Sequence, residues 1–423
     1  MIRTIFACKF APAMAAATLV LAACGDGTDV PPGQSSGVSG SSSTAGMSSA
    51  AGAATGGTSA TSATSAGAPP GGAAGSPSGG GWTAAGTGGQ TTGAASNGGG
   101  APMGGSGGSA GASDCTPIDP DATPEAQKLL CYIYSIYGKA VLSGQQETSW
   151  SNPQADIDYY ASTVGKHPAI LGGDYLYQDG AKPGGNTTKR ALAYWQAGGI
   201  TMMRYHMGAP PNADTYDNSK GTVANFDNLT IENTTENNSL KSKLDYLAAE
   251  LKVLQDAKVP VLLVPYHEVD KYAWFWWSKC TGPQFVKLWK YSVDYVNRTK
   301  GVHNVLWVMG YGHDGAMADF FPTGYTDLGG IDQYDKGKQP FIEHWQSAKA
   351  IVTPGMPIPL HETGTIPQPS AMFPSAAHWV LWNVWAGYQN TNAEGYTWNT
   401  PESIKTAYSD PHTVTRESLP SLK

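Results

Sequence analysis

The feature that most constrains this chain is a series of eight short apolar runs within its last three hundred residues or so. Each run is nearly continuous in hydrophobic residues, a pattern typical of parallel strands that are covered on both faces. We predict strands at residues Ala140–Gln146, Ala169–Tyr175, Ile200–His206, Val261–Glu268, Asn304–Met309, Asp327–Tyr334, Ile358–Glu362 and Trp379–Trp385.

Helical stretches alternate with these runs. Within Leu240–Lys258, five leucines recur at steps of four and three and form one apolar stripe along a helix. A second stripe runs from Phe285 to Val296, and Thr123 followed by Pro124 marks the start of an earlier helix. Eight strands alternating with helices fit an α/β fold of the (β/α)8 or TIM barrel type. An open doubly wound sheet fits less well, because no GxGxxG motif follows the first strand.

The first quarter of the chain has a different composition. Residues 1–23 resemble a secretory signal peptide, and the stretch "LAAC" at Leu21–Cys24, where they end, is similar to a bacterial lipoprotein signal. We therefore expect Cys24 to be the mature N-terminus and a lipid anchor, with an ordinary cleavable signal as the alternative. Residues 24–114 are nearly all Gly, Ser, Ala and Thr and are expected to form a disordered linker. These features predict an exported protein, either a cell-surface or outer-membrane lipoprotein or a secreted one, with a single folded domain at residues 115–423.

Charge and cysteine content exclude several functions. The net charge is -7 and no basic block occurs, which argues against a nucleic-acid partner. Cys115, Cys131 and Cys280 allow at most one intramolecular disulfide and leave one thiol over. Their spacing does not match a zinc cluster, no HxH or HExxH pair occurs, and no GxSxG elbow follows a predicted strand. We therefore expect no metal, no cofactor and no serine-hydrolase triad, and we expect a monomer.

Polar residues follow several predicted strands, at the end where a barrel places its catalytic cleft. They are Gln145, Gln146, Asp174, His206, His267, Glu268, Tyr334 and Glu362. A single carboxylate in such a position is equally consistent with a structural salt bridge. Two glutamates at the ends of nonadjacent strands, Glu268 and Glu362, indicate instead a pair across the cleft. Glycosidic bond cleavage needs such a pair, because one acid protonates the leaving oxygen while the other carboxylate attacks the anomeric carbon or activates water.

An aromatic stretch, Trp274–Trp277, follows Glu268 closely. Aromatic rings offer flat apolar faces, on which the C–H faces of sugars stack, so the stretch suits a glycan-binding cleft. Four consecutive side chains cannot all face one cleft, and we expect one or two of them to pack in the interior. A hydrophobic lid on the barrel rim is the alternative interpretation.

Taken in chain order, these motifs resemble the family 26 glycoside hydrolases, which are mostly endo-β-1,4-mannanases with retaining chemistry. The resemblance runs from Leu142 to Tyr388, nearly the whole folded domain. Its motifs are "LSGQQE", "PAILGGDYLY", "GGITMMRYHM", "VPYHE" followed by "WFWW", "GVHNVLWVM", "DLGGIDQY", "PIPLHETG" and "WVLWNVW". The resemblance implies hydrolysis of internal β-1,4-mannosidic linkages, with a β-mannan, galactomannan or glucomannan as the substrate.

The resemblance also implies a role for each matching residue. Glu268 would be the acid/base and Glu362 the nucleophile. The implied substrate-binding residues, with the two tryptophans as stacking platforms, are His206, His267, Trp274, Tyr334 and Trp382. Adjacent residues on a regular strand point to opposite faces, so His267 and Glu268 can both reach the cleft only where the strand end bulges or turns.

One departure from the family pattern lies just before the acid/base position. The family usually has Arg-Pro-x-His-Glu there, whereas this chain has Val264 in place of the arginine and lacks that cation beside the carboxylates. Arg204, at the end of the third predicted strand, is a candidate replacement. Two alternatives to a mannanase therefore stay open. One is another β-glycanase of the same fold, acting on β-1,3-xylan or mixed-linkage β-glucan, and the other is a surface glycan-binding protein without turnover.

Overall fold

The computed structural model describes residues 115–147, 154–176, 184–313, 315–337, 339–392 and 395–423. The predicted signal peptide, the predicted lipid anchor Cys24 and the predicted linker up to residue 114 lie outside these described residues. None of the helices in the described ranges has the length and apolar content that crossing a membrane requires.

Eight parallel strands form a closed barrel, which confirms the predicted (β/α)8 architecture. Each strand pairs with the next one along the chain, and the last strand closes onto the first through Gln145 and Val384. The strands are β2 (Gly144–Gln146), β3 (Ile170–Asp174), β4 (Ile200–Arg204), β5 (Val261–Val264), β6 (Val305–Tyr311), β7 (Leu328–Gln333), β8 (Leu360–Thr363) and β9 (Trp382–Val384).

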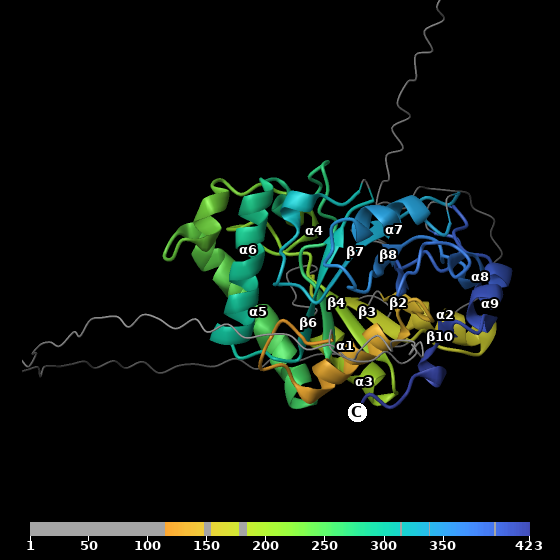
Figure 1. The fold of residues 1–423 in the computed structure, drawn as a ribbon. Helices are drawn as coiled ribbons and strands as arrows, with labels where there is room; N and C mark the ends of the chain where they lie inside the picture. The colour runs from red at the N-terminus through yellow and green to blue at the C-terminus, as the bar shows by residue number, and fades with distance from the viewer. Residues whose placement is uncertain (1–114, 148–153, 177–183, 314, 338, 393–394) are drawn as a thin grey trace, which may run out of the picture. The chain divides into compact units, whose positions relative to one another are not determined.

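Helices cover the outside of the barrel. The helix expected at Leu240–Lys258 is α5 (Thr235–Asp256), and all five leucines of its stripe are buried. Thr123 caps α1 (Pro124–Ile136), where its side chain accepts a hydrogen bond from the Ala126 amide. The other α-helices are α2 (Ala155–Val164), α3 (Gly184–Gln196), α4 (Tyr216–Ser219), α6 (Gly282–Asp294), α7 (Ile342–Lys349), α8 (Pro369–Met372) and α9 (Pro401–Ser409). Figure 1 shows α5 and α6 on one side of the strands and α8 and α9 on the other.

The connection from β6 to β7 departs from the regular alternation. In its described residues, 312–313 and 315–327, the helical element is the short turn η4 (Ala318–Phe320). Before β6 in the chain, α6 continues directly into η3 (Tyr295–Thr299). The second predicted stripe begins in α6, ends in η3 and is buried along its length. The remaining short turns are η1 (Phe226–Thr230), η2 (Trp276–Ser278) and η5 (Arg416–Ser418).

The first predicted strand, Ala140–Gln146, is two strands in the structure. β1 (Val141–Leu142) pairs in parallel with β10 (Thr413–Val414), and β2 begins after Ser143. The Ser143 hydroxyl donates to the Val414 carbonyl oxygen at 2.8 Å, which holds the junction. Because β1 precedes β2, this small sheet attaches the C-terminal segment at the amino end of the barrel, opposite the end expected to carry the cleft.

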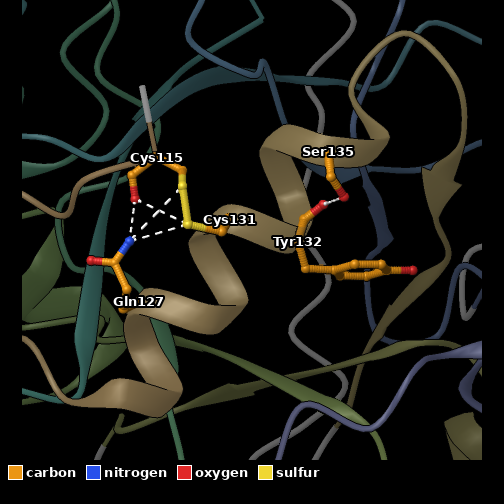
Figure 2. The surroundings of a disulfide bond; sticks show 5 residues. All are labelled: Cys115, Gln127, Cys131, Tyr132 and Ser135. Atoms are coloured by element: carbon orange, nitrogen blue, oxygen red, sulfur yellow. Dashed lines mark hydrogen bonds between the residues drawn. A yellow bond between two sulfur atoms is a disulfide. The ribbon is translucent and has the colours of Figure 1, made fainter. Parts of the chain in front are cut away.

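A disulfide joins Cys115 to Cys131 of α1, with the two Cα atoms 4.8 Å apart. Figure 2 shows Gln127, one turn earlier on α1, reaching toward both cysteines, and its side-chain amide donates to the Cys115 carbonyl oxygen at 2.7 Å. Cys280 is a free thiol, and its Sγ lies 3.3 Å from the Trp277 carbonyl oxygen. One disulfide and one free thiol agree with the number expected from the sequence for this domain.

Candidate active site

The residues predicted from the strand ends converge at the carboxyl end of the barrel. Because all eight strands are parallel, the residues that end or follow them lie at one end of the fold. The predicted residues placed there are His206 after β4, His267 and Glu268 after β5, Tyr334 after β7 and Glu362 within β8.

Three carboxyl groups form the centre of this end. One oxygen each from Glu268, Asp332 and Glu362 lies within 4.8 Å of the other two. Asp332 and Glu362 are register partners on the neighbouring strands β7 and β8, and they are 0% and 2% exposed. Glu268 keeps part of its surface exposed. The sequence predicts the two glutamates, and Asp332 is an additional member of the group.

A turn after β5 brings both His267 and Glu268 to the cleft. β5 ends four residues before Glu268, and Glu268 has a φ of 53°, in the left-handed region. A non-glycine residue held there costs about 1–3 kcal/mol and persists only where its surroundings fix it. Here Trp277 Nε1 donates to the His267 carbonyl oxygen at 2.7 Å, and Val269 bridges to Tyr311 of β6. The strand end therefore turns, as the adjacency of the two residues requires.

The carboxylate of Glu362 is held from both of its oxygens. The Tyr334 hydroxyl donates to Oε1 at 2.5 Å, and Nε of Arg204 lies 3.1 Å from Oε2. Arg204 is fully buried, and its remaining nitrogens donate to Oε1 of Gln146 at 2.6 Å and to the carbonyl oxygen of His361. The guanidinium is therefore fixed by three groups, and Glu362 has a buried positive charge beside it.

Arg204 lies level along the barrel with position 264, where the family pattern has its arginine. In the ladder between β4 and β5, Arg204 is the register partner of Val264. The cation therefore enters the site from the strand next to the one that carries it in the family pattern. The carboxyl groups therefore have a positive charge beside them despite Val264, because Arg204 forms an ion pair with Glu362.

Two histidines extend the site on the β4 side. Nδ1 of His206 is hydrogen-bonded to a carboxylate oxygen of Asp174, and Nε2 of His206 lies 3.1 Å from Nε2 of His267. Burial, the neighbouring His206 and the Arg204 guanidinium lower the pKa of His267 well below its usual range. His267 is therefore neutral and shares one hydrogen bond with His206. These contacts fix both rings beside the carboxyl groups.

The two glutamates have different electrostatic surroundings. Burial, reinforced by the negative charge of Glu362, raises the pKa of Glu268 to about 8. Burial also raises the pKa of Glu362, but the Arg204 guanidinium and the hydrogen bond from Tyr334 oppose that rise. Glu268 is thus the group that retains a proton more readily, whereas Glu362 has the partners that stabilise an ionised carboxylate.

The aromatic stretch after Glu268 splits into one surface residue and three interior ones. Trp274 is 42% exposed, whereas Phe275, Trp276 and Trp277 are fully buried. The Phe275 ring stacks on Trp277 with centroids 4.6 Å apart and lies 5.1 Å from the His267 ring. The sequence led us to expect one or two packing residues, and the structure has three. They support the turn that carries the acid/base candidate.

The structure does not agree with a platform role for Trp382. Trp382 is fully buried on β9, and its ring meets Tyr408 of α9 edge-on at 6.3 Å. The next residue, Asn383, points to the barrel interior, where its side-chain amide lies 3.5 Å from Oε1 of Gln146. Because strand residues alternate between faces, Trp382 must point outward to the helical layer. It therefore packs between strand and helix, away from the cleft.

Trp385, three residues later, is an aromatic side chain beside the site residues. It follows Asn383 by two residues, and its ring lies 5.6 Å from Cζ of Arg204 and 6.2 Å from the His206 ring. Asp332 of β7 similarly precedes Tyr334, just after the strand, by two residues. Residues two apart on a strand share a face, so this spacing was a signal in the sequence for both residues that the motif-based prediction missed.

Two groups of side chains in the described ranges have donors close enough for a cation. One is the set Glu268, Asp332 and Glu362, and the other is Asp119, Asp121 and His303. In the first set the positive charge beside Glu362 is supplied by Arg204. In the second, Nδ1 of His303 already lies 2.8 Å from Asp119. We assign neither set as a metal site.

The family of this chain follows from sequence comparison. The sequence model of glycosyl hydrolase family 26 matches residues 118–418. The chain is also similar to a mannan endo-1,4-beta-mannosidase of Thermothelomyces thermophilus, at 30% identity over 320 residues, and to mannan endo-1,4-beta-mannosidase B of Piromyces sp, at 26% over 321 residues. These alignments cover 71% and 73% of this chain, but 62% and 54% of the two relatives. The chain thus spans less than two thirds of their length.

Solved structures give the same result for the fold. GH26A from Muricauda sp. MAR_2010_75 aligns with a TM-score of 0.63 and 29% identity, covering 71% of this chain and 99% of that one. A beta-mannanase from a symbiotic protist of the termite Reticulitermes speratus, solved with a gluco-manno-oligosaccharide, aligns with a TM-score of 0.63 and 26% identity. That alignment covers 73% of this chain and 98% of the protist chain.

Proposed function

The chain belongs to glycosyl hydrolase family 26, and on that premise we propose that it hydrolyses internal β-1,4-mannosidic linkages of mannan-type polysaccharides with retention of configuration. The observation that carries the proposal is the pair Glu268 and Glu362, with carboxyl oxygens within 4.8 Å and unlike surroundings. Retaining enzymes need carboxyl groups about 5–5.5 Å apart, and inverting enzymes need about 6.5–9.5 Å for an intervening water. The spacing here supports retention.

In the first step, Glu362 attacks the anomeric carbon as a carboxylate. Arg204 and Tyr334 favour its ionised form, since one supplies a positive charge and the other a hydrogen bond. Glu268 gives its proton to the glycosidic oxygen as the bond to the anomeric carbon breaks. The products are a glycosyl ester on Glu362 and a free sugar hydroxyl, with Glu268 left as a carboxylate.

In the second step, Glu268 changes from general acid to general base. The Glu268 carboxylate takes a proton from water, the water oxygen bonds to the anomeric carbon, and Glu362 leaves as a carboxylate. Two inversions at the anomeric carbon restore the β configuration. The fixed rings of His206 and His267 support substrate binding in this proposal, with Trp274 and Trp385 as the aromatic platforms.

The relatives support the choice of substrate. The matched proteins from Thermothelomyces thermophilus and Piromyces sp carry the name mannan endo-1,4-beta-mannosidase. A glycan-binding protein without turnover was favoured by Val264, and the ion pair between Arg204 and Glu362 removes that reason. Other β-glycanase activities are separated from a mannanase by the substrate assay below.

The experiment compares turnover of galactomannan, glucomannan, β-1,3-xylan and mixed-linkage β-glucan by the purified protein. We expect new reducing ends from the first two. Glu362→Ala should abolish turnover, and azide should restore cleavage with an α-glycosyl azide as product. Glu343→Ala, which changes an exposed glutamate of α7, is the matched control and should act like wild type. Turnover of none of the four polysaccharides would refute the proposal, and turnover of xylan or mixed-linkage glucan alone would reassign the substrate.

We also propose that the protein is exported and lipid-anchored through Cys24. The sequence of residues 1–24 supports this, and the Cys115–Cys131 disulfide is of the kind that persists in oxidising compartments. Radiolabelled palmitate should be incorporated into the wild-type chain expressed in a bacterium and not into Cys24→Ala. Equal labelling of both chains, or of neither, would contradict the anchor.

A further inference from the structure

A third carboxyl group, Asp332, lies in the site without an assigned task. It is fully buried on β7, in register with Glu362 of β8 and two residues before Tyr334. Neither of its oxygens has a hydrogen-bond donor within the described residues. Nδ1 of His313 lies 3.9 Å from Oδ1, which is beyond hydrogen-bonding distance. A buried carboxylate with no donor and no cation of its own is costly.

The nearest partner of Asp332 is another acceptor. Carboxyl oxygens of Asp332 and Glu268 lie within 4.8 Å of each other, which brings the two groups together as potential hydrogen-bond partners. An ionised carboxylate can only accept hydrogen bonds, so the contact forms only if one of the two groups carries a proton. Glu268 must release its proton during each turnover, whereas Asp332 has no exposed surface through which a proton would exchange directly with solvent.

The charges around this pair oppose a second anion. The charged or titratable groups that face it are Glu362 from β8, Asp270 after β5, Arg204 from β4, Tyr216 of α4, His313 after β6 and Tyr334 after β7. The one buried cation among them, Arg204, is already paired with Glu362. Burial and the neighbouring Glu268 and Glu362 raise the pKa of Asp332 well above its usual range.

We propose that Asp332 is a permanently protonated carboxyl group that donates a hydrogen bond to Glu268 and thereby positions the acid/base. The inference rests on the proposed function, because it assigns the acid/base role to Glu268. Asp332 is a positioning residue: it acts through Glu268 and does not itself reach the substrate.

The proton balance is simple. When the glycosidic bond breaks, the proton of Glu268 moves to the leaving oxygen, and the new carboxylate keeps the hydrogen bond from Asp332. When water attacks, Glu268 recovers one proton from that water, and Asp332 is unchanged. A neutral donor stabilises the Glu268 carboxylate without adding charge beside Glu362, which an ionised aspartate would do.

The kinetic test uses three variants and two substrates in the full-length protein. Asp332→Asn keeps a neutral donor of the same shape, Asp332→Leu keeps the branching at Cγ without a donor, and Glu343→Ala is the surface control. Mannopentaose has a poor leaving group that needs the acid, and 2,4-dinitrophenyl β-mannobioside has a good one that does not. General acid catalysis contributes about 10²–10⁴-fold, so we expect Asp332→Leu to lose about that much on mannopentaose and much less in the glycosylation of the aryl substrate.

The Asn variant gives the deciding comparison. We expect it to keep a tenth or more of the wild-type kcat/KM on mannopentaose, with the alkaline limb of the pH profile at its wild-type position. A shift of that limb toward acid by more than about one unit would mean that Asp332 is ionised and acts by repulsion, which would overturn the proposal. Equal losses on both substrates in Asp332→Leu would mean a merely structural role and would overturn it as well.

An infrared measurement tests the protonation without any turnover. With ¹³C-labelled aspartate, wild-type protein at neutral pH should show a protonated carboxyl C=O band that is missing in Asp332→Asn. Burial also raises the pKa of Asp327 to about 7, but that residue contributes equally to both proteins. Absence of a difference band would overturn the inference even if mannan is hydrolysed. A difference band together with no hydrolysis of any glycan would overturn the proposed function instead.

Discussion

Arg204→Met removes the buried cation beside the proposed nucleophile, Glu362. Arg204 is fully buried, with Nε 3.1 Å from Oε2 of Glu362. Methionine keeps much of the side-chain length and removes the charge. The substitution also takes away the donors to Gln146 and to the His361 carbonyl oxygen. Glu362 then stays buried without its cation.

The magnitude follows from the distance. Two unit charges 3.1 Å apart interact by about 5 kcal/mol at an effective dielectric constant of about 20. Removing one partner of a buried pair typically costs about 3–5 kcal/mol, which agrees. Glu362 can avoid this cost by binding a proton. Its pKa would therefore rise, because the Arg204 charge that lowers it is gone.

The sign of the pH effect is fixed by the mechanism. Activity requires ionised Glu362, and Arg204 lowers the pKa of Glu362. Its removal raises that pKa, so the acidic limb of the kcat/KM profile should move to higher pH. At a pH on the wild-type plateau, kcat/KM should fall, by at most the roughly 10²–10⁴-fold that 3–5 kcal/mol corresponds to.

The assay is the pH dependence of kcat/KM on mannopentaose, with thermal unfolding measured in parallel. A compensating variant, Arg204→Met with Val264→Arg, returns the cation from the register partner and should recover part of the loss. The reasoning would be refuted if Arg204→Met left the acidic limb within about half a unit of wild type while kcat/KM stayed within about fivefold, because the ion pair would then have no influence on Glu362.

Three further outcomes are expected. Trp382→Ala should cost about 3–5 kcal/mol of stability, as for a core residue. Trp385→Ala should chiefly lower kcat/KM, through a loss of about 1–3 kcal/mol of transition-state stabilisation on the scale of stacking on aromatic rings. A kinetic defect in Trp382→Ala together with a stability loss in Trp385→Ala would instead make Trp382 the platform. Reduction of Cys115–Cys131, which closes a loop with a sequence separation of 16, should cost about 3 kcal/mol and lower Tm; an unchanged Tm in reductant would contradict this. Because Glu268 must be protonated and its pKa is raised to about 8, kcat/KM should fall as pH rises through about 8, and a limb near pH 5 would argue against it.

The strands were predictable because a barrel strand is apolar on both faces, and this pattern is local in sequence. Their ends were less predictable, because distant residues decide them. The run Val261–Glu268 reads as one strand, yet β5 stops at Val264, since Trp277 and Tyr311 hold the following turn. The run Ala140–Gln146 breaks at Ser143, because its first part pairs with a strand some 270 residues later.

The site was predictable in its carboxylates and less so in their surroundings. Glu268 and Glu362 follow strongly apolar strands, which places them at the cleft. To choose between Trp382 and Trp385, one must know which residues of β9 point into the barrel, and a motif match does not show this. Because side chains alternate between faces, the inward position of Asn383 identifies Trp385 as the residue on the side of the site. The pairing of Arg204 with Val264 depends on strand register, which the sequence of either strand alone does not fix.

The central claim is that Glu268 and Glu362 cleave a β-mannan with retention. Proton NMR of the first product formed from mannopentaose tests it most directly, before mutarotation mixes the anomers. The account predicts a β-anomer at the newly formed reducing end, since two displacements restore the original configuration. An α-anomer would mean a single displacement by water, and it would contradict both retention and the assignment of Glu362 as the nucleophile.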